Sequence, residues 1–211
     1  MRIAITSLSA RGESGIAVTL EINSAEHSQR ETFLLDGRAV ADLGLKVGEC
    51  SREVFEEIEH ASRVCTAKNK ALFLLGYGAS SPKNLARKLV MKGISKDIAT
   101  DAVKELLADR FLDPREDARR EAEKCVSKLL GRKRITATLF EKGYTERDIK
   151  YALASIEADG VDYIELCAER IRRSSTAIPD TPDEKRKLVS KLERYGFTLT
   201  EIKEAFNKIK A

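Results

Sequence analysis

The feature that most constrains the fold is a helical pattern that occurs three times, each time around a glycine: Gly93, Gly143 and Gly196. Leucine or isoleucine stands eight residues before each glycine, leucine four before it, and alanine nine after it. With the apolar residue that follows each glycine, these positions are Leu85, Ile135 and Leu188; Leu89, Leu139 and Leu192; Ala102, Ala152 and Ala205; and Ile94, Tyr144 and Phe197. Copies 50 and 53 residues apart that share so many positions indicate an internal repeat.

Each copy predicts a helix, a turn and a second helix. The apolar stripe at spacing four is helical, and a glycine tolerates the left-handed conformation that ends many helices. A hydroxyl residue two positions later (Ser95, Thr145 or Thr198) is expected to accept a backbone N–H and so begin the second helix. In two copies Asp148 or Glu201 completes a capping box. A further helical stretch precedes each pair, at residues 64–76, 117–130 and 162–173.

The N-terminal part predicts strands instead. Large apolar residues alternate with small or polar ones in residues 16–22, while residues 3–8 and 32–35 are candidate partner strands. The predicted fold class is therefore mainly α, with three tandem three-helix repeats after a small antiparallel β segment. The expected domains are a β segment (1–50), a connecting helix (51–63) and repeats at 64–113, 114–160 and 161–211. We expect the loop at residues 174–182 to be mobile.

Composition disfavours several classes of protein. The 211 residues contain two histidines, and the four cysteines lie far apart without metal-ligand spacing. The sequence contains neither a nucleotide-binding glycine loop nor an apolar run of the roughly 18 residues that a spanning helix needs. The N-terminus lacks the apolar core of a secretory signal. We therefore expect a cytoplasmic protein, not an enzyme, with no metal, no cofactor and no membrane partner, and we expect a monomer.

Basic residues are unevenly distributed. The net charge is +4, but residues 1–63 carry −4 and the remainder +8. A basic residue stands ten positions before each repeat glycine, at about 200° from the apolar stripe, so it should point away from the core. The candidate binding residues are Lys83, Arg87, Lys88, Lys133, Arg134, Lys142, Arg186 and Lys191, called the basic set below. They predict a charged track for a nucleic-acid backbone or an acidic filament; the alternative is three ordinary solvated helix faces.

A second functional reading starts from the same pattern. Two helices joined by a glycine turn are also the outline of a helix-turn-helix DNA-binding protein or transcriptional regulator. In that reading the second helix enters the major groove. Residues 96–106 and 146–157 each carry a net charge of −1, which phosphates would repel. Sequence-specific binding is therefore the less favoured alternative.

Three segments in order resemble a known family. They are ALFLLGYGASSPKNLARKLVMKGI from Ala71, FLD at 111–113 followed by Ala118, and GRKRITATLFEKGY from Gly131. This chain resembles the RecX regulatory proteins of bacteria, most closely over residues 71–157. It departs from them at Arg110, where members commonly have glycine, and at Pro114, where they often have aspartate. The resemblance implies a protein that binds the filament of the RecA recombinase in its groove and modulates strand exchange and ATPase, usually by inhibition. It also implies contact with single- or double-stranded DNA.

Overall fold

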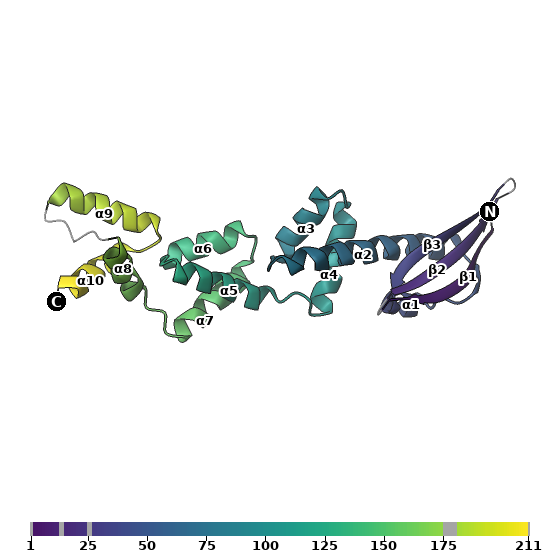
Figure 1. Cartoon of the computed structure of the whole chain (residues 1–211), viewed down its shortest axis with the longest axis horizontal. Helices are drawn as coiled ribbons and strands as arrows, with labels where there is room; N and C mark the ends of the chain where they lie inside the picture. Colours follow the sequence, from purple (N-terminus) through teal and green to yellow (C-terminus); the bar gives the residue numbers. More distant parts are fainter. Residues whose placement is uncertain (1, 13–14, 25–26, 175–180, 211) are drawn as a thin grey trace. The chain divides into compact units, whose positions relative to one another are not determined.

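The computed structural model describes residues 2–12, 15–24, 27–174 and 181–210 (Figure 1). As predicted, the chain is mainly helical, with a small antiparallel sheet at the N-terminal end. It divides into two compact units, which we call unit 1 (Met1–Gly78 and Leu85–Phe111) and unit 2 (Ala79–Asn84 and Leu112–Ala211). The division into five smaller domains remains a prediction.

The sheet has the strand order β3-β2-β1-β4. Its strands are β1 (Arg2–Arg11), β2 (Gly15–Asn23), β3 (Ser28–Asp36) and β4 (Gly48–Cys50), and neighbours are antiparallel. The three predicted strands are confirmed. The segment is not β alone, however, because helix α1 (Gly37–Asp42) interrupts it. The Asp36 carboxylate accepts a hydrogen bond from the Ala39 N–H at 2.8 Å and caps this helix.

Helix α2 (Arg52–Gly76) joins the sheet to the helical part of unit 1. It begins where the Val54 N–H donates to the Ser51 hydroxyl, and neither glycine nor proline occurs in the next 23 residues. Ile58 closes the apolar core of the sheet, while Val64 and Ala67 pack with helix α4 (Lys96–Ala108) (Figure 1). The helix therefore runs unbroken through residues 63 and 64, where we placed a boundary.

Lys68 of α2 gathers three carboxylates within unit 1. Its ammonium lies 2.8 Å from Asp36, 2.8 Å from Glu105 and 3.3 Å from Asp109, and its side chain is 12% exposed. Burial alone would raise the pKa of Asp36, but the hydrogen bonds from Lys68 and Ala39 outweigh burial and lower it. Burial alone would lower the pKa of Lys68, but its hydrogen bonds with Asp36 and Glu105 outweigh burial and raise it. This cluster ties the end of the sheet to α2 and α4.

The remaining helices lie between residues 82 and 210. They are α3 (Pro82–Met91), α5 (Pro114–Ser127), α6 (Arg132–Glu141), α7 (Glu146–Ala158), α8 (Tyr163–Arg173), α9 (Pro182–Arg194) and α10 (Leu199–Lys210). Gly93, Gly143 and Gly196 each separate two helices, with φ of 85°, 84° and 94°, as predicted. Helix α5 begins three residues before its expected start because Asp113 caps it. Residues 175–180 of the loop expected to be mobile lie outside the described part.

The helix caps follow the sequence in two of the three copies. Thr145 with Asp148 and Thr198 with Glu201 form the predicted capping boxes. Ser95 is the N-cap residue of α4, as predicted, but the predicted hydrogen bond is wrong, because its side chain makes no capping bond to the α4 backbone. The Ser95 side chain instead hydrogen-bonds Asp97 and lowers the pKa of that carboxyl group.

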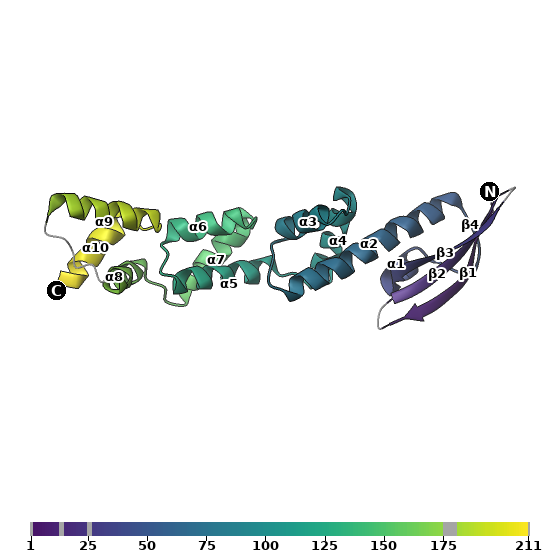
Figure 2. The same cartoon turned by 45° about the horizontal axis from the view of Figure 1, so that its top comes forward.

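In unit 2, two helix groups each enclose an apolar core (Figure 2). In α5–α7 the core includes Ile135, Leu139 and Ile156, and in α8–α10 it includes Leu192 and Phe197, all at most 2% exposed. In each group the first and third helices share the larger interface, and the middle helix packs more lightly. Over the described residues, no helix has both the length and the apolarity to cross a membrane.

Replacing Leu139 with Ala should lower the free energy of unfolding by roughly 2–5 kcal/mol, because it leaves a cavity in the α5–α7 core. Phe140→Ala is the matched control: it removes a larger side chain from the next position, but that side chain is 70% exposed. The control should change stability by no more than about 0.5 kcal/mol. Urea denaturation measures both. Equal effects would show that the leucine stripe is not what holds the group together.

Replacing Lys68 with Met should destabilise unit 1 by about 2 kcal/mol or more, because Asp36 and Glu105 lose their shared partner. Asp36, whose pKa is below its ordinary value, stabilises the fold only while it is ionised. The difference from the parent protein should therefore shrink as the pH falls from about 6 to about 3. Urea denaturation at both pH values tests this, with the exposed Lys70→Met as the control. A difference independent of pH would contradict it.

Candidate polyanion-binding surface

The start of α3 is held on the glycine turn after α6, inside unit 2. The Ser81 hydroxyl accepts the Asn84 N–H at 3.2 Å and so caps α3, while it donates to the Lys142 carbonyl at 2.6 Å. A methyl group added to Gly143 would lie 3.0 Å from this hydroxyl and 3.4 Å from the Lys83 Cβ. The absence of a side chain at Gly143 therefore lets Lys83 approach the turn.

The start of α6 is held on the glycine turn after α9 in the corresponding way. The Gly131 N–H donates to the Tyr195 carbonyl at 2.8 Å, and the Lys133 N–H donates to the Gly196 carbonyl at 3.2 Å. A Cβ on Gly196 would lie 2.3 Å from the Arg134 nitrogen, and one on Gly131 would lie 2.5 Å from the Gly196 backbone. The two backbones can meet only because both positions are glycine.

These two junctions use equivalent positions of the repeat. Ser81 and Gly131 each stand twelve residues before a repeat glycine, and each bonds the carbonyl that precedes the next repeat glycine. The N–H groups at the start of α6 would otherwise be left without partners, since Gly131 offers no capping side chain. The next turn supplies the missing acceptors, which fixes where the first residues of α6 lie.

The junctions bring cations together. Lys83 at the start of α3 meets the turn that carries Lys142, and Arg134 at the start of α6 meets the turn after Arg194. The N-terminal end of a helix also carries a partial positive charge. Neighbouring positive charges repel one another, and an anion that binds among them relieves that repulsion. The junctions are therefore suited to bind a polyanion.

The basic set is exposed or half-buried throughout. Lys83, Lys133 and Lys191 are exposed, and none of them forms an ion pair with another described residue. Arg134 and Arg186 lie 3.9 Å from Glu141 and Asp183, at the limit of an ion pair. Whether these residues bind a partner stays a prediction.

Lys142 differs from the rest of the basic set. Its ammonium pairs with Glu121, a carboxylate on α5 that is 8% exposed and also bonds Lys124 at 2.7 Å. Burial would raise the pKa of Glu121, but the two lysines outweigh burial and lower it. Lys142 therefore holds α5 to the end of α6, and part of its charge is already compensated.

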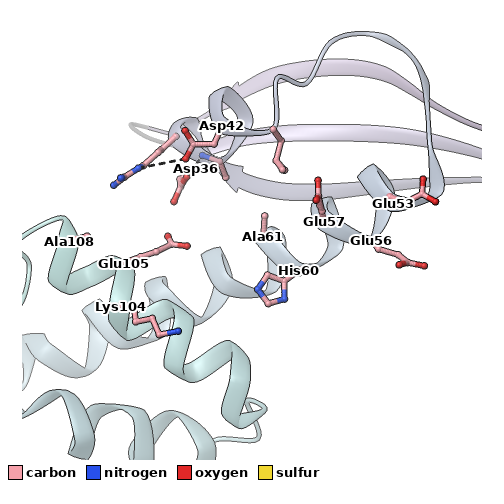
Figure 3. Close-up of a pocket in the computed structure, with 13 residues that line it drawn as sticks. Asp36, Asp42, Glu53, Glu56, Glu57, His60, Ala61, Lys104, Glu105 and Ala108 are labelled. Atoms are coloured by element: carbon pink, nitrogen blue, oxygen red, sulfur yellow. Dashed lines mark hydrogen bonds and ion pairs between the residues drawn. The ribbon is translucent and has the colours of Figure 1, made fainter.

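Unit 1 has a cavity of opposite character, of about 800 Å³ between α1, α2 and α4 (Figure 3). Arg38, His60, Lys104 and four apolar residues line it together with six carboxylates: Asp36, Asp42, Glu53, Glu56, Glu57 and Glu105. The pKa of Glu53 is lowered by its hydrogen bond with Ser51, as that of Asp36 is by Lys68. General acid catalysis needs a raised pKa, so these two carboxylates are poor candidates for it. Among the described residues, no three His, Cys, Asp or Glu side chains are grouped as metal ligands would be.

Sequence reasoning missed a second basic cluster in unit 2. Lys128, Arg170 and Arg173 line a cavity together with Lys191, although they come from three different helix ends. The recoverable signal was the i, i+3 spacing of Arg170 and Arg173 on α8. The approach of Lys128, more than 40 residues earlier in the sequence, had no such signal.

Two solved structures share the fold of this chain. The crystal structure of regulatory protein RecX has a TM-score of 0.71 at 19% identity, and the match covers 96% of this chain and 99% of that chain. RecX from Lactobacillus salivarius has a TM-score of 0.59 at 22% identity, over 71% of this chain and 98% of that one. No family model and no curated protein matches the sequence. The likeness establishes the fold.

Replacing Gly196 with Ala should disrupt the α6–α9 junction, because the new methyl group would overlap the Arg134 backbone. Gly160→Ala is the control, since Gly160 lies in the same unit at a φ of 95° and has nothing within 4 Å of an added Cβ. Both variants are destabilised by about 1–2 kcal/mol, because alanine is strained in the left-handed conformation. Gly196→Ala should lose at least about 2 kcal/mol more in urea denaturation. Similar losses would mean that the close approach is not a constraint.

Proposed function

We propose that this chain is a RecX-type regulatory protein that binds the RecA nucleoprotein filament and modulates, most often by inhibition, its ATPase and strand exchange. One observation carries the proposal: exposed cations lie at two equivalent junctions, at the starts of α3 and α6, each held by hydrogen bonds to the backbone carbonyls of the next turn. The fold shared with solved RecX structures supports it. The partner would be a polymer whose negative charge recurs along its length.

The proposal includes tandem three-helix repeats: α2–α4, α5–α7 and α8–α10. In each group the first and third helices pack most extensively, and a glycine turn separates the second from the third. A repeated unit offers the same side-chain positions at intervals, as binding to a filament requires. Lys83 and Lys133 occupy equivalent positions, are exposed and form no ion pair in the described part of the chain, so both charges are available to a partner.

Direct contact with DNA is part of the proposal. Lysine and arginine side chains bind phosphates without reading sequence, so the basic set would bind single- or double-stranded DNA alike. Binding should then weaken steeply with salt, since each phosphate contact releases a counterion. We place the protein in the cytoplasm as a monomer that acts by binding and catalyses no reaction of its own.

The purified protein alone should hydrolyse neither nucleotide nor nucleic acid, yet it should change the ATPase rate of a DNA-bound recombinase. A coupled ATPase assay with filaments, with DNA alone and with free recombinase separates these cases. Intrinsic turnover that survives repurification would contradict the regulator. Binding to one DNA sequence about 10³-fold better than to random sequence would instead favour the helix-turn-helix alternative.

The variant Lys83→Glu, Lys133→Glu, Arg186→Glu should lose most of its filament affinity and show a smaller salt slope. It should melt within a few degrees of the parent, because isolated exposed charges are worth only about 0–1 kcal/mol each. Filament affinity at two salt concentrations and a thermal melt measure both effects.

The control for this variant carries the same charge change on α7 and α10: Arg147→Glu, Lys150→Glu, Lys203→Glu. These residues are exposed and form no ion pair in the described part of the chain. The control should keep most of its filament affinity. If it loses affinity and the first variant does not, the second helix of each pair binds the nucleic acid and the basic set faces solvent.

A further inference from the structure

A cavity of about 380 Å³ lies in unit 2, where α5, α8 and α9 end. Four cations line it: Lys128, Arg170, Arg173 and Lys191. Among the described residues of its lining there is no carboxylate. Three leucines and the side chain of Tyr195 complete its walls. It differs in this from the cavity in unit 1, whose lining carries six carboxylates.

Arg170 makes this cavity rigid. Its Nη1 donates to the Lys128 carbonyl at 2.8 Å, which satisfies an acceptor at the end of α5. The guanidinium carbon also lies 3.2 Å from the centre of the Tyr195 ring, a cation–π contact. Arg170 therefore links α8 to both flanking elements, and the other three cations stand on helix ends that it holds in place.

The four cations carry more positive charge than the three helix C-termini neutralise. Each helix C-terminus carries about half a negative charge, so three together offset about 1.5 of the four positive charges. Glu169 pairs with Arg173 at 2.9 Å and offsets one more. About +1.5 remains uncompensated. The pKa of Tyr195 is lowered by its hydrogen bond with Arg170 and by the charges of Arg170, Lys191 and Arg194, as expected where the local field favours an anion.

We propose that this cavity binds a phosphate monoester, carried by a mononucleotide or by the 5′ end of a nucleic-acid strand. A monoester carries about −1.5 to −2 at neutral pH, which matches the uncompensated charge better than the single charge of a diester. Leu188 and Leu192 provide apolar surface for the attached sugar. The site does not depend on filament binding.

The test uses the full chain without recombinase and a short single-stranded oligonucleotide labelled at its 3′ end. Fluorescence anisotropy compares the 5′-phosphorylated oligonucleotide with the same oligonucleotide ending in a 5′-hydroxyl. The phosphorylated form should bind about tenfold tighter. Equal affinities would overturn the proposal. Unlabelled AMP and inorganic phosphate serve as competitors: displacement by AMP identifies a mononucleotide site, and displacement by phosphorylated oligonucleotide alone identifies a strand-end site.

The variant Lys128→Gln, Lys191→Gln tests the location of the site and leaves Arg170 in place. It should lose the preference for the 5′-phosphate. The control Lys150→Gln, Lys203→Gln removes the same charge from exposed positions of unit 2 outside the cavity and should keep the preference. Melting temperatures within a few degrees show that both variants fold. A preference that persists in the first variant, or that disappears equally in both, would overturn the proposal.

Discussion

The contact on which unit 2 most depends is between two backbones, at Gly131 and Gly196. A helix begins with N–H groups that have no partner within the helix, and the N-cap of α6, Gly131, has no side chain to supply one. The carbonyls of Tyr195 and Gly196 take that role. The first turn of α6 is therefore complete only when the α9–α10 turn is folded against it, and neither glycine can carry a side chain.

The position of Gly131 is occupied by Ser81 in the preceding copy, and there a side chain makes the contact with the next turn. A serine hydroxyl caps its own helix and still donates to the carbonyl of the next turn, so a side chain does at one junction what an N–H does at the other. Both solutions place a lysine two residues later at the junction: Lys83 in one and Lys133 in the other. The position of the cation thus follows from helix capping.

Local chemistry explains what could be predicted from the sequence. The glycine turns, the leucine stripes and the capping boxes at Thr145 and Thr198 each depend on residues within a few positions of one another. The predicted capping bond of Ser95 does not form, because its hydroxyl hydrogen-bonds the competing acceptor Asp97. The Lys68 cluster and the cavity around Arg170 could not be predicted, because their partners lie 32 and 42 residues away and only the folded chain brings them together.

The charge of the two units constrains the kind of partner. In unit 1 the lining of the cavity carries six carboxylates against Arg38 and Lys104, so a surface that presented only phosphates there would be repelled. In unit 2 the junction lysines and the cavity at the ends of α5, α8 and α9 carry uncompensated positive charge. Free DNA complements only the second kind of surface, whereas a filament of protein wound on DNA offers both protein side chains and phosphates. The proposed nucleoprotein partner therefore offers a surface of complementary charge to each of the two units.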